Sequence, residues 1–173
     1  RGKEIFDILV KLKQEGKVRF IGVSVHTVEE AMAALEDERI DALQVIFNLL
    51  DQRMAERVFP EALKKNVGII VREPLASGLL TGKYSPEHEF PKDDHRRRWL
   101  EEKRKADWEK IRCLQGVVSD TGIPLASVAL EYPLRYEAVS AIIPGAKTRA
   151  QVEANLKASL ESRLDAKVFA SLQ

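Results

Sequence analysis

The sequence lacks several features that mark particular classes of protein. It contains a single cysteine, Cys113, so no disulfide can form within the chain, which is typical of a reducing compartment. It has no N-x-S/T glycosylation signal, no signal-peptide pattern at its first residues and no apolar run long enough to cross a membrane. These absences lead us to expect a cytoplasmic protein with no membrane partner.

A strong charge of either sign is also missing. Lys and Arg together number 28 and Asp and Glu number 27, for a formal net charge of +1. Such a balance offers no electrostatic basis for binding nucleic acid. The one basic run, at residues 96–98, is followed by basic residues interleaved with glutamates and an aspartate, which is typical of a solvated surface. We therefore expect no nucleic-acid partner.

What the sequence does contain is an alternation of short apolar runs and amphipathic segments. Strands are predicted at residues 18–23, 42–47, 67–71 and 139–143, because these runs are apolar and too short for helices. Helices are predicted at residues 1–15, 27–36, 54–66, 107–119 (with a weaker start near 99), 124–134, 148–160 and 165–173. Alternating strands and helices predict a parallel sheet of about four βα units. In such sheets ligands bind in the loops at the carboxyl ends of the strands.

The corner after the last predicted strand has the pattern of an anion site. A tight glycine turn is predicted at Gly145, and Thr148 and Gln151 then form a T-x-x-Q capping box at the start of a helix. Free backbone N–H groups and the positive end of the helix dipole attract anions at such a place. Lys147 and Arg149 add two positive charges. The corner therefore predicts a phosphate-binding site.

The loop after the third predicted strand carries a second phosphate signal. Gly78, Gly82 and Lys83 resemble a Walker A loop, but the spacing is one residue short, and Tyr84 stands where the magnesium-binding Ser or Thr is needed. Both departures argue against a nucleoside-triphosphate loop. The glycines nevertheless let the backbone approach a phosphate closely, and the lysine supplies a point charge.

Taken together, these stretches resemble the aldo-keto reductases. Residues 143–155 (IPGAKTRAQVEAN) resemble the last strand–helix corner of that family, residues 16–24 its fifth strand, 41–48 its sixth and 68–84 its seventh. The resemblance implies an α/β fold in which residues 1–173 form parallel (β/α) units, the C-terminal half of a TIM (β/α)8 barrel. The first four βα units have no counterpart in the sequence, and a complete barrel takes roughly 250 residues.

The resemblance also implies an NADP(H)-dependent oxidoreductase that reduces a small-molecule carbonyl substrate. In the family an Asp, a Tyr, a Lys and a His from the first four units serve catalysis, and none of them has a match here. We therefore expect a truncated, cofactor-binding half that is inactive alone and pairs with its N-terminal half or with itself. A non-catalytic nucleotide-binding module and a self-pairing half-barrel stay open as alternatives.

Individual cofactor contacts follow from the same resemblance. Two residues match contacts to the nicotinamide carboxamide, one arginine stands where many members stack an aromatic ring on the nicotinamide, the P-L-x-x-G segment with its lysine matches the pyrophosphate loop, and the last corner matches the adenosine and 2′-phosphate contacts. The sequence departs from the family at Val25, where Asn is common, and at Ala154, where Glu is common. The implied cofactor-binding residues are Ser24, Gln44, Arg72, Pro74, Leu75, Ser77, Gly78, Lys83, Gly145, Lys147, Arg149, Gln151 and Asn155.

Some of these residues have plainer explanations. Gln44 could instead be a polar strand residue satisfied by its neighbours, Arg72 could form an ion pair with Glu73, and Gln151 could serve as a helix cap alone. His26 is either a loop residue near the substrate opening or a ligand or general acid. It cannot inherit the role of the family's catalytic histidine, which belongs to the absent fourth strand. The sequence does not identify the carbonyl substrate.

Overall fold

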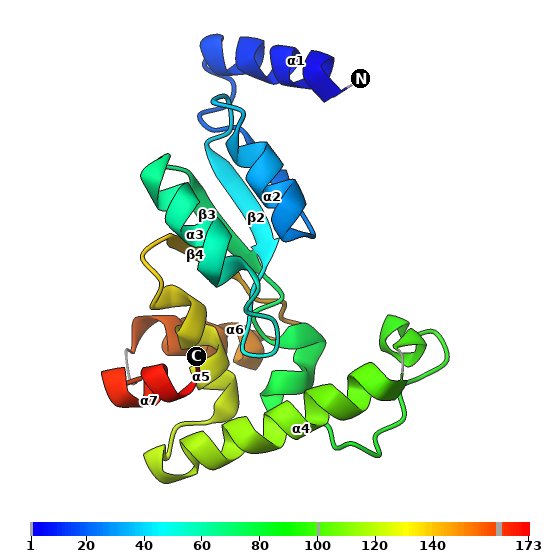
Figure 1. The fold of residues 1–173 in the computed structure, drawn as a ribbon. Helices are drawn as coiled ribbons and strands as arrows, with labels where there is room; N and C mark the ends of the chain where they lie inside the picture. The colour runs from blue at the N-terminus through cyan, green and yellow to red at the C-terminus, as the bar shows by residue number, and fades with distance from the viewer. Residues whose placement is uncertain (1, 100, 162–163) are drawn as a thin grey trace.

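The computed structural model describes residues 2–99, 101–161 and 164–173. Arg1, predicted to lie in the first helix, is outside this range. Strands and helices alternate along most of the chain (Figure 1). The elements are α1 (Gly2–Gln14), β1 (Gly22–Ser24), α2 (Val28–Leu35), β2 (Ala42–Ile46), α3 (Met54–Lys64), β3 (Gly68–Arg72), η1 (Ala76–Thr81), η2 (His95–Arg98), α4 (Glu101–Val118), η3 (Ser119–Thr121), α5 (Leu125–Leu134), β4 (Val139–Ile143), α6 (Arg149–Leu160) and α7 (Ala166–Ser171).

The strands form one parallel sheet in the order β1-β2-β3-β4, which confirms the predicted α/β architecture. The register aligns Ser24 with Gln44, and Arg72 with Ile143. All four strands therefore end at one edge of the sheet, where the predicted binding loops follow. The outermost strands, β1 and β4, each have a strand neighbour on one side only.

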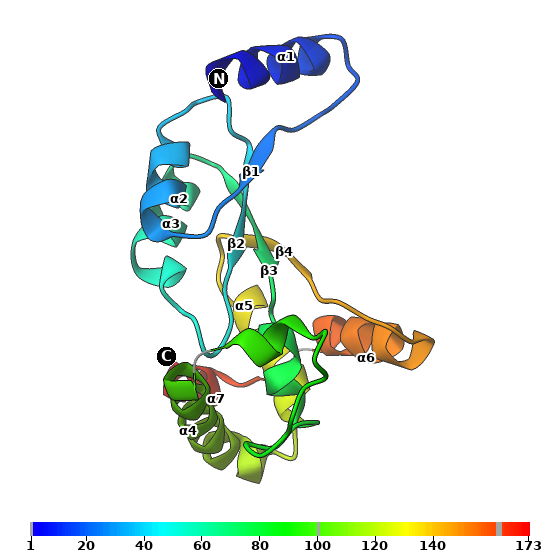
Figure 2. The same ribbon diagram turned by 90° about the vertical axis from the view of Figure 1, so that its right-hand side faces the viewer.

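The two faces of the sheet have different surroundings. Leu43 and Val45 of β2 and Ile69 and Val71 of β3 are completely buried, and α2 and α3 lie over this side of the sheet (Figure 2). Because side chains alternate along a strand, the residues between them point to the opposite face. That second face is only half-buried in β2 and β3. It is the face that the predicted barrel would enclose.

An aromatic cluster fixes the helices below the strand ends. Phe47 packs edge-to-face against Phe59 of α3, with ring centroids 4.7 Å apart, and against Tyr136 at 5.0 Å. Tyr132 stacks on Phe47 at 5.8 Å and contacts Phe169 of α7 at 5.4 Å. Buried aromatic pairs of this kind stabilise beyond their burial area. The cluster therefore holds α3, α5 and α7 in fixed positions relative to β2.

The first strand differs from its prediction. It covers Gly22–Ser24 and not residues 18–23, and Phe20 is 70% exposed. The backbone N–H of Ile21 donates to the Asp41 carboxylate at 2.8 Å, so a side chain occupies the position of a strand partner. Helix α4 begins at Glu101, which confirms the weaker helix start predicted near residue 99.

Within the described ranges, no single helix has the length and apolar character needed to cross a membrane. Among the described helices, one pair, Glu101–Thr121 and Leu125–Leu134, has that length and apolar character when its two members are taken together, and these are bent at 95° to each other. The second helix of that pair contributes Val128 and Ala129 to the core, where both are completely buried.

Candidate functional site

Ser24, the last residue of β1, lies beside Gln44 in the middle of β2. They are register partners, and the Gln44 side-chain amide donates to the Ser24 hydroxyl over 3.2 Å. Close approach of the two strands needs Gly22, because a Cβ there would lie 2.7 Å from the Ala42 carbonyl oxygen. Val25, where the family often has Asn, is 6% exposed and belongs to the core. The structure thus brings together a hydroxyl and an amide on the open face.

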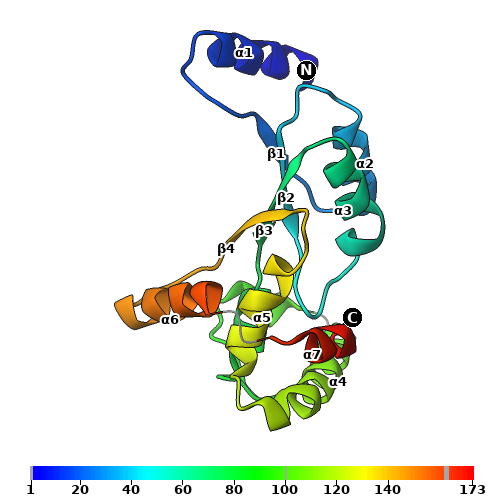
Figure 3. The same cartoon turned by 90° about the vertical axis from the view of Figure 1, so that its left-hand side faces the viewer.

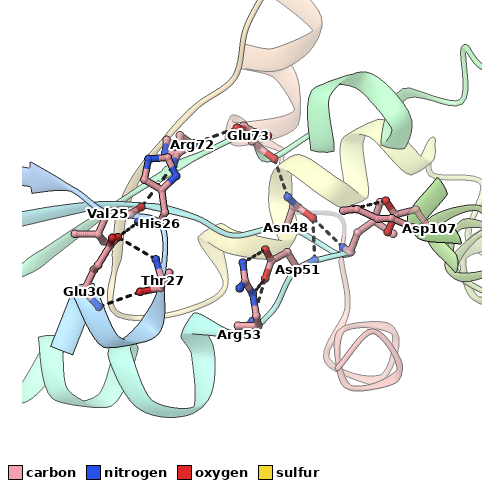
Figure 4. Close-up of polar contacts among 12 residues, drawn as sticks. Val25, His26, Thr27, Glu30, Asn48, Asp51, Arg53, Arg72, Glu73 and Asp107 are labelled. Atoms are coloured by element: carbon pink, nitrogen blue, oxygen red, sulfur yellow. Dashed lines mark hydrogen bonds and ion pairs between the residues drawn. The ribbon is translucent and has the colours of Figure 1, made fainter. Parts of the chain in front are cut away.

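Arg72 at the end of β3 connects the segments that follow β1 and β3 (Figure 4). Its Nη1 lies 3.0 Å from a Glu73 carboxylate oxygen, and its Nη2 lies 3.0 Å from Nδ1 of His26 and 3.5 Å from the Val25 carbonyl oxygen. The Glu73 ion pair proposed from the sequence is therefore present. The Nε of Arg72 is buried and has no hydrogen-bond partner among the described residues. The guanidinium is held across the ends of β1 and β3 and retains one unused donor.

His26 is fixed by its neighbours. Because the guanidinium is always protonated, Nδ1 of His26 is the acceptor in their contact, which places the ring proton on Nε2. The His26 backbone N–H donates to the Glu30 carboxylate at 2.7 Å, and Thr27 and Glu30 form a reciprocal capping box at the start of α2 (Figure 4). These backbone hydrogen bonds, from His26 first and then Thr27, lower the pKa of Glu30. His26 contacts Arg72, and no feature of its surroundings assigns it a proton-transfer role.

Asn48, which follows β2, holds nearby backbone groups in place. It is 3% exposed, its side-chain NH₂ donates to the Glu73 carbonyl at 3.0 Å, and its side-chain oxygen accepts from Leu50 and Asp51 N–H groups at 2.9 and 3.0 Å. The Glu73 backbone has a φ of 56°, in the left-handed region. Asn48 therefore helps hold the unusual backbone that starts the loop after β3.

That loop is the most constrained segment of the site. Pro74 is buried and Leu75 and Ser77 are half-buried, and Ala76, Ser77 and Gly78 have φ values of 47°, 52° and 94°. Leu79 and Leu80 then anchor the segment in the core with 2% and 0% exposure. The left-handed backbone therefore lies directly after β3, in the segment where the sequence predicts phosphate binding. Lys83 is exposed, with its ammonium 5.7 Å from the Tyr84 ring.

The corner after β4 differs from its prediction in two ways. Gly145 does not have a positive φ, and residues 144–146 form an extended arm without the expected tight turn. Thr148 caps α6 by accepting from the Gln151 N–H at 3.2 Å, but the Gln151 side chain accepts from the Lys147 N–H at 2.6 Å and not from Thr148. Thr148 therefore caps the helix without a reciprocal contact from Gln151. The Gln151 side chain is long enough to reach past Thr148 to the backbone of Lys147.

The remaining residues of this corner are on or beside α6, which packs on α5 and otherwise stands out beside β4 (Figure 3). Lys147, Arg149 and Gln151 are exposed, and Asn155, one turn further, is half-buried. The Arg149 side chain is 92% exposed and pairs with Glu153 at 2.7 Å. Such exposed pairs are weak, so the guanidinium can turn to another anion. The positive charge of the corner is retained.

Sequence reasoning missed one residue of the site. Arg96, in the loop between β3 and α4, donates from Nη1 to the Ser77 carbonyl at 3.0 Å. Its position in a mixed-charge run suggested a solvated side chain, and no local pattern connects it to a residue so far upstream. Among the described residues, no cluster of three His, Cys, Asp or Glu side chains could hold a metal ion.

Comparison with known proteins adds three findings. The family model described as "Aldo/keto reductase family" matches residues 2–173. The L-glyceraldehyde 3-phosphate reductase of Escherichia coli K12 is 29% identical over 168 residues, which cover 90% of this chain and 49% of that protein. The pyridoxal 4-dehydrogenase of Microbacterium luteolum is 26% identical over 153 residues, 87% of this chain and 42% of that protein.

Solved structures agree with these matches. The holo form of an aldo-keto reductase from Bacillus halodurans superimposes with a TM-score of 0.78 at 27% identity, over 98% of this chain and 55% of that one. A glycerol dehydrogenase from Gluconobacter oxydans has a TM-score of 0.78 at 26% identity, over 95% of this chain and 50% of that one. The chain spans about half the length of the relatives it matches.

Proposed function

We propose a function from one premise: the chain belongs to the aldo/keto reductase family. Its parallel sheet and helices match half of the (β/α)8 barrel of the family's solved structures, and its relatives are reductases and dehydrogenases. We propose that residues 1–173 form the NADP(H)-binding C-terminal half of such a barrel, within a cytoplasmic oxidoreductase that reduces a small-molecule carbonyl compound.

One observation carries this proposal most directly. Ser24 and Arg72 are the last residues of β1 and β3, and Gln44 is the register partner of Ser24 in β2. The left-handed loop at Ser77 and Gly78 follows β3, so these groups all lie toward the carboxyl ends of parallel strands in a single sheet. This is the edge at which α/β barrels bind their ligands. The groups also suit a dinucleotide, since they combine neutral donors and acceptors for an amide, a planar cation and closely approachable backbone for phosphate.

The proposed contacts follow the order of the strands. Ser24 and Gln44 would bind the nicotinamide carboxamide, and Arg72, with its unused Nε donor, would lie beside the ring. When bound, the cofactor supplies the hydride for carbonyl reduction. The residues assigned to its pyrophosphate are Pro74, Leu75, Ser77, Gly78 and Lys83, and those assigned to its adenosine and 2′-phosphate are Gly145, Lys147, Arg149, Gln151 and Asn155.

Proton donation to the carbonyl is not assigned to any residue of this chain. The family's Asp, Tyr, Lys and His set would come from four further βα units that cover the open face and complete the barrel. His26 already accepts from Arg72, and the three tyrosines lie at Tyr84, in the loop after β3, and at Tyr132 and Tyr136, in and after α5. Tyr132 and Tyr136 belong to the aromatic cluster beneath the strand ends. We propose that this chain binds the cofactor but does not catalyse reduction alone.

A second candidate is a half-barrel that pairs with another copy of itself, with or without a bound nucleotide. It is favoured by the open edges of β1 and β4 and by the exposed apolar side chain of Ile143, which is 48% exposed at the end of β4. Unpaired strand edges act as templates for another chain. The same observation suits pairing with the first half of a barrel, which we prefer because it also explains the cofactor residues.

Cofactor choice tests the proposal. NADPH should bind more tightly than NADH, because Lys147 and Arg149 lie at the start of α6, where a 2′-phosphate adds negative charge. Lys147→Ala should weaken NADPH binding by about 1–3 kcal/mol, the range of a charged hydrogen bond, and leave NADH binding unchanged. Fluorescence titration measures both constants. Lys157→Ala, on the last turn of the same helix, serves as the matched control. Equal dissociation constants for the two cofactors would refute the assignment of this corner.

A further inference from the structure

The turn after β3 has a backbone that must be held in place. Ala76, Ser77 and Gly78 are consecutive and all have positive φ, at 47°, 52° and 94°. Two of these three residues have a side chain, and L-residues with a Cβ disfavour the left-handed region. Such conformations persist only where the surroundings impose them, and they cluster at ligand-binding sites.

Contacts within the loop hold both ends of this turn, and the Ser77 hydroxyl donates to the Glu73 carboxylate at 3.3 Å. On its C-terminal side, Leu79 and Leu80 are buried in the core and Thr81 donates from Oγ1 to the Gly78 carbonyl at 2.6 Å. On its N-terminal side, the Gly78 N–H donates to the Leu75 carbonyl at 2.9 Å. The Ser77 carbonyl at the centre of the turn accepts from Nη1 of Arg96 at 3.0 Å, a residue 19 positions later.

Arg96 is well placed to impose this conformation because its own side chain is fixed. Asp94 accepts from its Nε at 2.9 Å and from its Nη2 at 2.6 Å, which is the bidentate fork of a strong arginine–carboxylate pair. The guanidinium lies over the Phe90 ring at 4.1 Å and the Tyr84 ring at 4.9 Å, and only 13% of the Arg96 side chain is exposed. One donor, Nη1, is thereby directed at the turn.

The same group also closes the space behind Gly78. A Cβ at that position would lie 3.3 Å from a Tyr84 ring carbon and 3.5 Å from Nη1 of Arg96. The guanidinium and the ring therefore lie directly against Gly78. The loop of residues 85–99 thus supports the turn from behind, although none of its residues matches a cofactor contact.

We propose that Arg96 is a positioning residue for the cofactor pyrophosphate. It acts through the Ser77 carbonyl, which it holds so that the backbone of Ser77 and Gly78 keeps the left-handed shape that receives the phosphate oxygens. This inference rests on the proposed function, because it concerns how the same loop binds NADP(H). Arg96 does not itself bind the cofactor.

Binding of two different ligands distinguishes a positioning role of Arg96 from a general structural role and from simple charge attraction. NADPH uses the pyrophosphate turn and the α6 corner, whereas adenosine 2′-monophosphate has the 2′-phosphate and no pyrophosphate. Both dissociation constants are measured by titration calorimetry on the purified protein and on Arg96→Ala and Arg96→Lys. We expect both substitutions to weaken NADPH binding about tenfold, as for one lost charge-assisted hydrogen bond, and to leave the nucleoside monophosphate unchanged. Lysine keeps the charge but lacks the planar fork.

Each other outcome contradicts the inference. Equal losses for the two ligands would indicate a general structural role, and wild-type affinity in Arg96→Lys would indicate charge attraction in place of positioning. Unchanged NADPH binding in both variants would refute the inference directly while leaving the proposed function intact. If the unsubstituted protein binds neither ligand, the proposed function fails and this inference fails with it. Arg57→Ala, an exposed arginine of α3, controls for lost charge.

Discussion

At the scale of single residues, the strand ends combine side chains that serve the backbone with groups left available for a ligand. The Asn48 side chain donates to the Glu73 carbonyl, and the Glu30 carboxylate accepts from the His26 N–H. The Gln151 side chain accepts from the N–H of Lys147, in the segment before α6. Arg72 retains a buried, unused Nε, and the Ser24–Gln44 pair is accessible on the open face. The side chains that bond to backbone groups set the shape of the loops. Arg72 and the Ser24–Gln44 pair are the groups that a bound cofactor would contact.

The capping box of α2 gives a prediction at this scale. Thr27→Ala removes the side-chain oxygen that accepts from the Glu30 N–H at 3.1 Å, and should lower the free energy of unfolding by about 1 kcal/mol, as for other N-caps. Ser159→Ala on α6 is the control, since that hydroxyl only bonds back to the Leu156 carbonyl. Urea unfolding measures both. A loss of similar size in the two variants would contradict a specific capping role.

At the scale of elements, prediction from sequence succeeds where the signal is local. The order of helices and strands follows from apolar runs and from stops such as Gly16 and Gly122, both of which have positive φ. The Ser24–Gln44 pair is also predictable, because parallel strands end at one edge. The length of β1 cannot be predicted in this way, since it depends on the side chain of Asp41, the residue before β2.

The binding loops show the same limit. Sequence patterns identify the glycine-containing loop after β3, but they do not reveal its support by Arg96, because that contact joins two irregular segments. They also predict a tight turn at Gly145 where the chain is extended, since Pro-Gly is a common turn signal and the nearby sequence does not show where α6 packs. Contacts between irregular segments depend on packing, which has no period in the sequence.

The connection between α1 and the sheet gives a pH-dependent prediction. The Lys13 ammonium lies 2.8 and 2.6 Å from the two Asp41 carboxylate oxygens, and one of these oxygens also accepts from the Ile21 N–H. Hydrogen bonding by Lys13, and next by Ile21, lowers the pKa of Asp41 below its usual value. A lowered folded-state pKa contributes stability above the unfolded value of about 3.9, and this is lost as the pH falls through the folded-state value.

Asp41→Asn should therefore flatten the acid side of the stability curve. The variant is expected to be less stable than the unsubstituted protein at pH 7 and to lose less unfolding free energy below about pH 4. Urea unfolding across this range measures the difference. Asp7→Asn is the control, because the Asp7 side chain is 72% exposed in its pair with Arg39. Parallel curves for the Asp41 variant and the unsubstituted protein would show that Asp41 is not responsible.

At the scale of the whole molecule, one side of the sheet is closed by helices and the other is open. Among the residues that the structure describes, no strand pairs with the outer edges of β1 and β4. Apolar side chains are exposed on the outer elements, including Phe20 at 70%, Leu156 at 56% and Leu160 at 81%. Exposed edges and apolar patches mark surfaces that other chains cover. We propose that four further βα units cover these surfaces in an active barrel. The cofactor contacts and the catalytic groups would then belong to different halves.

This division is tested most directly by titrating the purified 173-residue chain with NADPH and then adding a simple aldehyde to the same sample. Nicotinamide fluorescence reports binding, and absorbance of the reduced nicotinamide reports turnover. We expect saturable binding of NADPH and no oxidation of it, because general acid catalysis alone contributes about 10²–10⁴-fold and its residues are not matched in this chain. Steady oxidation of NADPH by the chain, or the absence of any NADPH binding, would contradict the division.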